Sequence, residues 1–452
     1  MHDALPPYPA YKPSTVPWIG SVPAHWEVRQ LGRIGRFSKG SGGTKEDEVD
    51  QGVPCVRYGD LYTQYRFFIE RTKAYVSAEK ATGYTPIYYG DVLFAGSGET
   101  LEEIGKSAVN LLSEPACCGG DVILFRPSIS VNARFLGYAT DCPQATYQKA
   151  GMGRGITVMH IYASELKYLT IALPPLAEQA AIVRYLDYVD RRVRRLIRAK
   201  RRLIALLNEQ KQVLIHQAVT RGLDPAVPLK DSGVAWLGQV PAHWEVRRLR
   251  SLMDVTTGDR DTAHKSENGL YPFFVRSQIV ERINTWSFEG EAVLTAGDGA
   301  GVAKVFHHII GKFDYHQRVY KFSNFQRVLG RFFFEYFRAT LRFEALAGNA
   351  KSTVDSLRRP MLQNFPVLLP SFTEQEAIVA YLDQATADLD SAISRAQREI
   401  DLLNEYRTRL IADVVTGQLD VRAAAAALPT DDPLEAEEAE GLEEAEGLEE
   451  EL

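Results

Sequence analysis

The chain contains few cysteines and no long apolar run. Its four cysteines, Cys55, Cys117, Cys118 and Cys142, form no Cys-x-x-Cys pair, so a zinc site or a disulfide framework is poorly supported and ordinary buried thiols are expected. No apolar run approaches the roughly 18 residues of a membrane span. Residues 1–17 lack the basic start and apolar core of a signal peptide. We therefore expect a cytoplasmic protein that makes no use of a membrane.

The last 22 residues contain no basic side chain. Asp431 to Leu452 holds 12 acidic side chains, so the formal net charge of −6 conceals a body, residues 1–430, that carries +6. A mildly basic body is compatible with a nucleic-acid partner but does not require one. The stretch 418–452 is expected to be a disordered, solvated acidic tail, and the alternative is an acidic segment that binds a partner.

Signatures of a catalytic centre are also missing. The nearest candidate for a phosphate-binding loop, Thr100 to Ser107, has threonine where the loop needs its first glycine. The glycines of 151–155 have the wrong spacing for a dinucleotide fingerprint, and no Asn/Asp-Pro-Pro-Tyr/Phe methyltransferase signature occurs. His307, His308 and His316 lack the spaced carboxylates of a metal site. We expect neither a catalytic residue nor a metal on this chain.

An eight-residue sequence that occurs twice organises what is present. Val22–Arg29 reads Val-Pro-Ala-His-Trp-Glu-Val-Arg, and Val240–Arg247 repeats it 218 positions later. The chain is therefore one unit written twice. His25 and His243 stand beside Pro and Trp in the repeat, so a packing or capping role is favoured over catalysis. We expect the octapeptide to form the base of each domain, docked against a long helix or the domain core.

Short apolar runs separated by Gly and Pro fill two regions, 17–174 and 234–370. Val92–Ala95 and Val122–Phe125 are examples, and runs of this length predict strands. Each region is expected to be a mixed α/β (α+β) domain. An N-terminal tail, 1–16, precedes the first.

Two long helices are predicted, one after each domain. Residues 176–219 contain neither Gly nor Pro and space their apolar residues as in a coiled coil. They predict a central helix over 175–222, about 65 Å long, followed by a linker at 223–233. The pattern recurs 196 positions later and predicts a second helix over 371–417. The predicted seam comprises Ile182, Leu186, Val189, Val193, Leu196, Leu203, Leu207 and Leu214, then Ile378, Leu382, Ala385, Leu389, Ala392, Ala396, Glu399, Leu403, Tyr406 and Leu410.

The place of the second domain between the helices constrains their direction. If that domain is compact, the second helix must run back along the first. Burial of roughly 16 seam side chains, at about 1.5–3 kcal/mol for the larger ones, would hold the pair together. The prediction is an antiparallel coiled coil with a domain at each end and an approximate two-fold axis. Ile197, Ile204, Ile393 and Ile400 are expected on its outer faces, where partners would cover them.

The motifs of both copies, taken in order, resemble one family. They are Trp18-Ile19-Gly20 with Pro23 and Trp26, Gly90-Asp91-Val92-Leu93-Phe94, Leu173-Pro174-Pro175 followed by Glu178-Gln179, and in the second copy Gly290-Glu291-Ala292-Val293-Leu294 and Leu369-Pro370 followed by Glu374-Gln375. Over nearly its whole length the chain resembles the specificity subunit of Type I restriction-modification enzymes.

The resemblance implies a function. The two α/β regions would be target recognition domains that each read one half of a bipartite double-stranded DNA target. The helices would set the spacing and dock two adenine methyltransferase subunits. Motor-nuclease (restriction) subunits would complete the complex, and S-adenosylmethionine, Mg²⁺ and ATP would belong to these partners, with no cofactor on this chain. The alternative is a non-catalytic scaffold whose duplicated domains bind proteins.

DNA contact requires cations for phosphates and forked or amide side chains for base edges. Two basic positions recur in both copies, Arg57 with Arg276 and Lys106 with Lys304. Repeated positions favour phosphate contact or a structural salt bridge, and polar loops that differ between the copies are better candidates for base readout. The other candidates are Lys39, Thr44, Lys45, Tyr58, Gln64, Arg66, Lys149 and Arg154 in the first domain, and Arg260, Thr262, Ser277, Gln278, His316, Gln317, Arg318, Lys351 and Ser352 in the second.

Residues 191–202 hold eight cations in twelve positions. Like charges so close together repel one another on a helix surface. Part of the run is expected to pair with acids of the second helix, such as Asp388 and Asp390. The remainder would face either DNA or a methyltransferase subunit.

Overall fold

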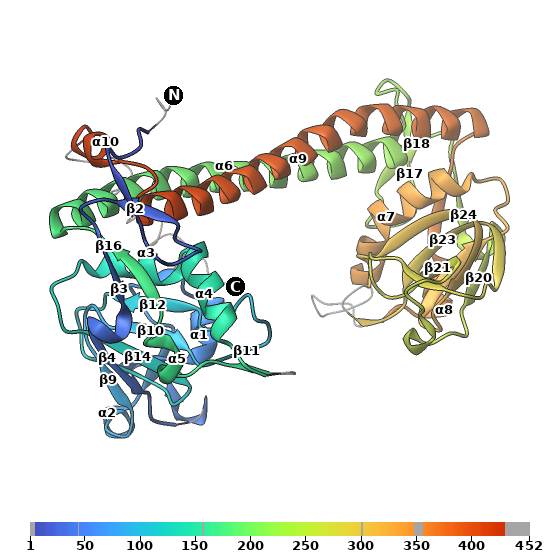
Figure 1. The fold of residues 1–452 in the computed structure, drawn as a ribbon. Coiled ribbons are helices and arrows are strands. Elements are labelled where there is room, and N and C mark those ends of the chain that lie inside the picture. The colour runs from blue at the N-terminus through green and yellow to red at the C-terminus, as the bar shows by residue number, and fades with distance from the viewer. Residues whose placement is uncertain (1–4, 44, 156–157, 300–301, 348–355, 430–452) are drawn as a thin grey trace. The chain divides into compact units, whose positions relative to one another are not determined.

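The computed structural model describes residues 5–43, 45–155, 158–299, 302–347 and 356–429. The chain forms two compact units, the first built from residues 1–199 and 399–452 and the second from residues 200–398. Helix α6 (Leu176–Arg221) begins in the first unit and ends in the second, whereas α9 (Phe372–Val415) begins in the second and ends in the first (Figure 1). None of the helices in the described ranges is long and apolar enough to cross a membrane.

Two five-stranded sheets form the domain of the first unit. One has the order β4-β14-β10-β12-β7 and the other the order β5-β8-β6-β13-β9, each with a single parallel pair among its named neighbours, β12 with β7 and β13 with β6. Val92–Ala95 is buried throughout, as expected for the central strand of the first sheet. The strands are β4 (Gly35–Lys39), β14 (Val122–Pro127), β10 (Val92–Ala95), β12 (Ser107–Asn110), β7 (Phe67–Ile69), β5 (Glu48–Val49), β8 (Ala74–Val76), β6 (Val53–Val56), β13 (Ala116–Cys118) and β9 (Thr85–Ile87).

Shorter elements surround these sheets. The predicted thiol environment is confirmed, because all four cysteines are buried and Cys55 and Cys117 are register neighbours on β6 and β13. The remaining elements of the unit are β1 (Tyr11–Pro13), β2 (Ser21–Pro23), β3 (Glu27–Gln30), β11 (Ser97–Gly98), β15 (Met159–His160), β16 (Thr170–Leu173), α1 (Tyr58–Thr63), α2 (Ala78–Ala81), α3 (Ala133–Asp141), α4 (Pro143–Met152), α5 (Ala163–Leu166), α10 (Arg422–Ala426) and two 3₁₀ turns, Leu31–Arg33 and Lys45–Asp47.

The domain of the second unit has one six-stranded sheet, in the order β20-β25-β23-β24-β21-β22. Its long hairpin places Gly290 opposite Gly311, with φ angles of 141° and 134°, a backbone conformation that glycine adopts readily. Helix α7 (Gly330–Ala347) packs on the sheet through edge-to-face ring contacts such as that of Phe322 with Phe337, whose centroids lie 4.9 Å apart. The elements are β17 (Leu229–Asp231), β18 (Gln239–Pro241), β19 (Glu245–Arg248), β20 (Asp254–Thr257), β21 (Tyr271–Phe274), β22 (Glu281–Ile283), β23 (Phe288–Ala296), β24 (Phe306–Tyr315), β25 (Val319–Ser323), β26 (Pro366–Leu369), α7 (Gly330–Ala347), α8 (Arg359–Asn364) and two 3₁₀ turns, Leu249–Ser251 and Thr262–His264.

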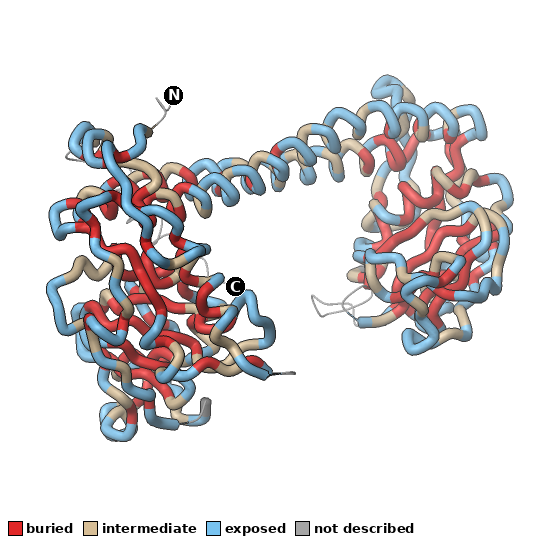
Figure 2. Tube along the Cα trace, viewed as in Figure 1, coloured by how far each residue is buried: buried red, intermediate tan, exposed pale blue. Residues whose placement is uncertain are grey.

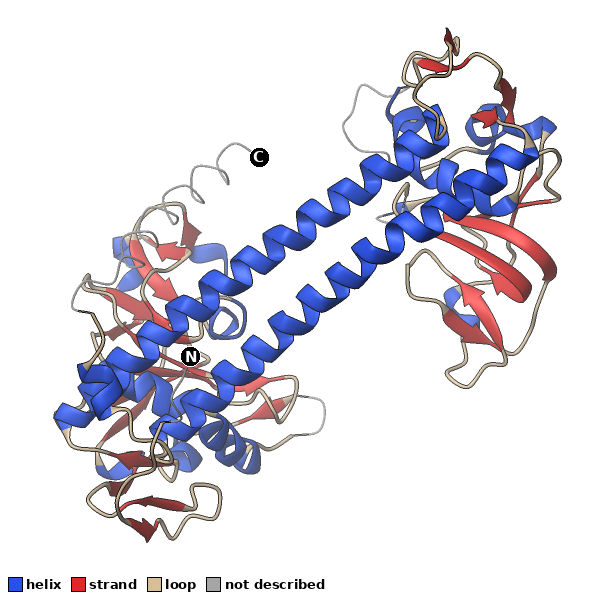
Figure 3. Cartoon of the chain, turned by 90° about the horizontal axis from the view of Figure 1, so that it is seen from above, coloured by secondary structure: helices blue, strands red, loops and turns tan. Residues whose placement is uncertain are grey.

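Buried residues follow the strands of both domains, and the predicted fold class of two α/β domains with long helices is confirmed (Figure 2). Within each unit the helices run antiparallel. Asp190 of α6 pairs with Arg407 of α9 in the first unit, and Lys211 of α6 lies 2.6 Å from Asp390 of α9 in the second, so residue numbers rise along one helix as they fall along the other. The two long helices are the longest blue elements in Figure 3.

The predicted seam is partly correct. On α9, Ile378, Leu382, Ala396 and Leu410 are buried as predicted and Tyr406 is 39% exposed, and on α6 Leu207 and Leu214 are half-buried. Ile182, Leu186, Val189 and Val193 are buried, but Leu196 and Leu203 are 49% and 42% exposed. The outward position predicted for Ile197 and Ile400 is also wrong, because both are buried. Their neighbours in that prediction, Ile204 and Ile393, are half-buried.

The reason is the helical period. Ile182, Val193, Ile204 and Ile215 lie eleven residues apart and are all buried or half-buried. Eleven residues in three turns correspond to about 3.67 residues per turn, whereas a heptad requires 3.5. The buried stripe therefore departs from the heptad after Val193, where Ile197 and Ile204 are more buried than Leu196 and Leu203.

The repeated octapeptide seats the first domain on α6. Trp26 is fully buried and its Nε1 donates to Glu178 Oε2 at 2.9 Å, while His25 Nε2 lies 2.6 Å from Glu178 Oε1. Strand β3, which comes directly after Trp26, pairs with β16, the strand immediately before α6. The prediction that the octapeptide docks against a long helix is confirmed.

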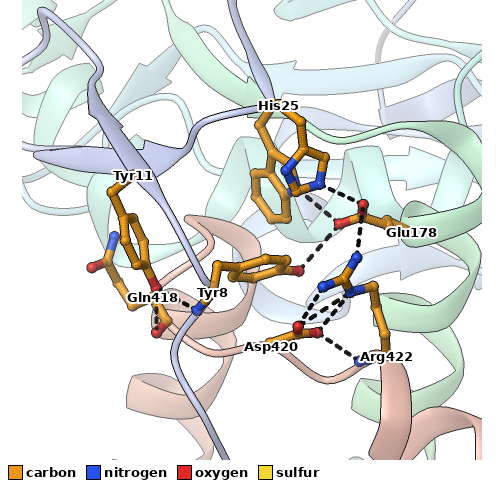
Figure 4. A network of polar contacts seen from close by, with 8 residues as sticks. Tyr8, Tyr11, His25, Glu178, Gln418, Asp420 and Arg422 are labelled. Carbon is orange, nitrogen blue, oxygen red and sulfur yellow. Dashed lines mark hydrogen bonds and ion pairs between the residues drawn. The ribbon is translucent and has the colours of Figure 1, made fainter.

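Both chain ends reinforce this base (Figure 4). Tyr8 Oη donates to Glu178 Oε2 at 3.3 Å, and burial together with the nearby carboxylates raises the pKa of the Tyr8 phenol. Asp420 and Arg422 form a close ion pair, and the Arg422 guanidinium lies 5.0 Å from the centre of the Tyr8 ring. Residues 418–429 were predicted to belong to a disordered tail, and this part of the prediction is wrong because Val421 and Ala425 are buried. Residues 430–452 lie outside the described ranges.

The second domain has the same base with different surroundings. Trp244 Nε1 donates to Glu374 Oε1 at 3.2 Å, and His243 Nε2 lies 2.6 Å from that oxygen. Partial burial alone would raise the pKa of Glu374, but hydrogen bonds from His243, Ser371 and Trp244 outweigh it and lower the pKa to about 2. One carboxylate on a long helix therefore organises each base.

Matched glycines end the two long helices. Gly222 follows α6 and Gly417 follows α9, and both have a φ angle of 78°, the left-handed conformation of a helix C-cap. A Cβ on Gly417 would clash with Pro23 of the octapeptide, and one on Gly222 would lie 3.2 Å from the Trp244 ring. Glycine thus lets each helix end approach one domain base closely.

Candidate nucleic-acid interface

Two arginines of the second domain converge on one carboxylate. Arg276 follows β21 and Arg318 precedes β25, and their Nη1 atoms lie 3.0 and 2.8 Å from the two oxygens of Asp298, which follows β23. Partial burial alone would raise the pKa of Asp298, but the hydrogen bonds from both arginines outweigh it and lower the pKa. The two arginine side chains nevertheless remain 41% and 57% exposed. They are oriented by Asp298 and still reachable from solvent.

A second polar group adjoins them through the loop between β24 and β25. Gln317 Nε2 donates to Asp261 Oδ2 at 3.2 Å, and its backbone N–H donates to the carbonyl of Arg260 at 2.8 Å. Arg260 Nε in turn lies 3.3 Å from Asp314. Five predicted candidates, Arg260, Arg276, His316, Gln317 and Arg318, are thus brought together, and we call them the polar edge of the second domain.

His316 supports this edge from behind. Its ring is 3% exposed, and Nδ1 accepts a hydrogen bond from the Arg318 N–H at 3.0 Å. Burial, with the nearby Arg276, lowers the pKa of His316 and favours the neutral ring. The prediction that His316 contacts DNA is wrong, because its ring is covered by the protein.

The other candidates of the second domain lie outside the polar edge. Ser277 Oγ accepts from the Ile279 N–H at 3.1 Å, and Gln278 Nε2 donates to the Phe306 carbonyl at 3.3 Å, so both side chains stabilise the loop after Arg276. Thr262 begins a 3₁₀ turn beside Asp261. Lys351 and Ser352 lie outside the described residues.

In the first domain the candidates are dispersed. Arg57 Nη1 lies 2.7 Å from Glu48, so the two repeated arginines both form ion pairs, as the structural alternative anticipated. Tyr58 beside it is 43% exposed. Gln64 is exposed and donates to Thr63 Oγ1 at 3.3 Å.

Three more candidates lie on other elements. Lys39 is exposed on β4, and Arg154 is 76% exposed and 3.6 Å from Glu165. The Lys45 side chain and the whole of Thr44 lie outside the described residues.

Lys149 corrects the prediction most clearly. Its side chain is fully buried, and Nζ donates to Asp141 Oδ1 at 2.7 Å and to the Thr140 carbonyl at 3.0 Å. The predicted DNA contact by Lys149 is wrong, because a buried ammonium held by a carboxylate cannot reach a phosphate.

Each unit also has a groove between a long helix and its domain. In the second unit a groove of about 1390 Å³ lies between α6 and α7, and Lys211, Lys304, Arg338 and Arg342 line it together with apolar side chains such as Phe343. Arg338 and Arg342 were missed by sequence reasoning, although their spacing of four residues places them on one helix face.

The first unit has a smaller groove of about 650 Å³ between α9 and α4. Lys106 and Arg66 line it, where Lys106 Nζ donates to the Tyr62 carbonyl at 2.8 Å and Arg66 donates to Thr408 Oγ1 of α9 at 3.3 Å. Burial, with the nearby Arg407, lowers the pKa of Arg66. The repeated lysines, Lys106 and Lys304, therefore face equivalent grooves in the two units.

Known proteins place the chain in a family. Residues 23–205 and 241–399 match the family described as Type I restriction modification DNA specificity domain. The chain is 30% identical over 183 residues to the Type I restriction enzyme EcoDI specificity subunit of Escherichia coli, a match that covers 40% of each chain. It is 23% identical over 436 residues to the Type I restriction enzyme MjaVIII specificity subunit of Methanocaldococcus jannaschii, which covers 89% of this chain and 94% of that one.

A solved structure has the same fold. It was described in a study of complex assembly and conformational transition of the type I R-M system, and it matches with a TM-score of 0.65 at 17% identity, over 88% of this chain and 99% of that one. Each family segment begins within one copy of the octapeptide, spans the domain that follows and ends within the long helix after it. The chain therefore belongs to the family of Type I restriction-modification specificity subunits.

Proposed function

We propose that this chain is the DNA sequence-recognition subunit of a Type I restriction-modification complex, and that each domain reads one half of a bipartite target. The observation that carries the proposal is the contrast between equal bases and unequal polar surfaces. The octapeptide and its helix carboxylate recur in both domains, whereas the polar edge of the second domain has no counterpart of the same composition among the predicted positions of the first. Two readers of different DNA halves need this combination.

The polar edge has the chemistry of base readout. Arginine donates two parallel hydrogen bonds to guanine, whereas glutamine donates one hydrogen bond to adenine N7 and accepts one from the adenine N6 amino group. Asp298 orients Arg276 and Arg318, and Asp261 orients Gln317. These side chains are therefore partly ordered before DNA binds, which lowers the entropic cost of immobilising them in the complex. Lys106 and Lys304, which recur in the two grooves, suit phosphate contact because that contact carries no sequence information.

The long helices suit a spacer. Each is a single helix of 46 or 44 residues, and the length of a continuous helix is set by its residue count at about 1.5 Å per residue. We propose that α6 and α9 set the spacing between half-sites and dock two adenine methyltransferase subunits. Restriction subunits would join them, with S-adenosylmethionine, Mg²⁺ and ATP bound by these partners.

Retention of duplex DNA by the chain with its methyltransferase subunits tests the proposal. The complex should retain one bipartite sequence far more strongly than a scrambled duplex. The logarithm of the binding constant should fall linearly with the logarithm of the salt concentration. A duplex in which only the spacer bases are changed is the matched control and should bind equally. Equal retention of target and scrambled duplexes would instead indicate a scaffold that binds proteins.

A further inference from the structure

The face of α6 that points away from α9 in the first unit carries a stripe of arginines. Arg184, Arg191, Arg195 and Arg198 fall within an arc of about 60° on an ideal helix, and we call them the arginine stripe. Arg184, Arg195 and Arg198 are exposed, and Arg191 is half-buried. The buried seam that begins at Ile182 occupies the opposite side of the helix.

This part of α6 has a large excess of positive charge. Between positions 184 and 198 the sequence has six arginines and two acids, Asp187 and Asp190. Both acids also serve cations outside the stripe, since Asp187 lies 3.3 Å from Arg134 and Asp190 pairs with Arg194 and Arg407. A helix segment with this charge composition gives its surroundings a positive potential, which attracts a chain segment of opposite charge.

The C-terminal end of the described chain lies at the first arginine of the stripe. Arg184 Nη2 donates to the carbonyl of Leu428 at 2.8 Å and to that of Pro429 at 3.2 Å. The chain beyond Pro429 therefore starts within reach of the next arginines of the stripe. Residues 431–452 hold 12 acidic side chains and no basic one.

The lengths are compatible. The stripe covers fourteen residue steps of helix, or about 21 Å, whereas 22 residues of extended chain reach at most about 75 Å. A tethered segment of this kind acts at an effective concentration of the order of millimolar. Its charge is opposite to that of the stripe.

We propose that the acidic segment 431–452 binds the arginine stripe of α6 in the free subunit and shields it from other polyanions. The stripe is thus an interaction surface whose occupant is a segment of the same chain. The attraction is electrostatic and partly exposed, so it must weaken as salt shortens the Debye length. This inference does not depend on the reading of half-sites by the two domains.

Resonance energy transfer in the full chain tests the proposal. Donor and acceptor dyes are attached at Ala199→Cys, an exposed position on α6, and at Ala439→Cys in the acidic segment, since all four native cysteines are buried. Transfer should be high at low salt and should fall severalfold at about 1 M NaCl, where the Debye length is about 3 Å. The variant R191Q/R195Q/R198Q should show the low transfer already at low salt.

The control variant R33Q/R36Q/K73Q removes the same charge from exposed positions of the first domain. It should keep the transfer of the parent chain, and circular dichroism of both triple variants should match the parent, since glutamine is a good helix former. Transfer that is unchanged in R191Q/R195Q/R198Q, or that falls equally in the control, would overturn the proposal.

A second measurement separates DNA from the acidic segment as the occupant. A non-specific duplex is titrated against the parent chain and against a chain in which the 12 acids of 431–452 are replaced by Gln or Asn. The chain without the 12 acids should bind the duplex more tightly than the parent chain. Adding R191Q/R195Q/R198Q to that chain should remove most of the increase in affinity. If the stripe variant weakens duplex binding while the dyes never approach, the stripe is a DNA surface and the proposal fails, whereas sequence-selective retention would be unaffected.

Discussion

The two domains of this chain agree where they are attached and disagree where they face solvent. In both, a buried tryptophan of the octapeptide donates to a carboxylate of a long helix, Trp26 to Glu178 and Trp244 to Glu374. Above this shared base, the second domain gathers five of its candidates at one polar edge, whereas the first disperses its candidates and buries Lys149. The difference shows that repetition marks the attachment of a domain, and that a contact surface must be sought where the copies differ.

The largest expected effect tests the shared base. Trp26→Ala and Trp244→Ala should each destabilise their own unit by about 4 kcal/mol, because each removes a fully buried indole and leaves a helix carboxylate without its donor. Hydrogen exchange measured by mass spectrometry should show faster exchange in the unit that carries the substitution. Trp→Phe at each position is the matched control and should cost less. If only one of the two Trp→Ala substitutions destabilised its own unit, the two bases would not be equivalent.

The next effect concerns the buried cation of the first domain. Lys149→Met should lower the free energy of unfolding of the first unit by about 3 kcal/mol, because it leaves Asp141 without its partner. Lys106→Met, at a partly exposed site, should cost much less. Chemical denaturation followed by exchange of the first unit measures both. If Lys149→Met were neutral for stability and weakened duplex binding, Lys149 would be a DNA contact after all.

Substitutions at the polar edge should act on selectivity. Arg318→Gln, at a position that differs between the copies, should cost about 1–3 kcal/mol of binding to the target and relax the preference at one base pair. Lys304→Gln, at the repeated position, should weaken binding to all duplexes alike and reduce the salt slope by about one unit. Competition binding with single-base target variants separates the two outcomes. Equal loss on every sequence for Arg318→Gln would identify Arg318 as a phosphate contact.

The smallest effect concerns pH. A carboxyl whose pKa is lowered on folding stabilises the protein above its unfolded pKa of about 4.3, and this contribution disappears as the pH falls through the folded value, here about 2 for Glu374. The second unit should therefore lose stability between about pH 4.5 and pH 2. Thermal unfolding at a series of pH values should show that the melting temperature of Glu374→Gln falls less steeply below about pH 4.5 than that of the parent chain. If the melting temperatures of both proteins fell equally at acid pH, Glu374 would not be the group that causes the loss of stability.

The sequence was sufficient for the architecture because its signals are local or repeated. Gly and Pro delimit the strands, and the recurrence of the octapeptide and helix pattern predicts two domains with long helices. The prediction placed Ile197 on the outside and Leu196 in the seam because a heptad template assumes 3.5 residues per turn, whereas the buried residues of α6 keep an eleven-residue spacing. The order of residues 418–429 was missed because it depends on long-range contacts, such as that of Asp420 and Arg422 with Tyr8.

The candidate surface was less predictable for a physical reason. A lysine in a polar loop and a lysine buried against a carboxylate have the same sequence signature, and only the fold of α3 and α4 places Lys149 on Asp141. Asp298 was overlooked because acids are not expected at a DNA surface. Its role is to orient two arginines, and an acid between two glycines after a strand is the signal that was available.

Exchange of one domain tests the central claim most directly. Residues 17–172 are replaced by the corresponding domain of another specificity subunit, and the adenines methylated by the reconstituted complex are mapped by sequencing. One half of the recognised sequence should change, while the other half and the spacer length remain. A change in both halves, or in neither, would contradict the account of two independent readers on a shared frame.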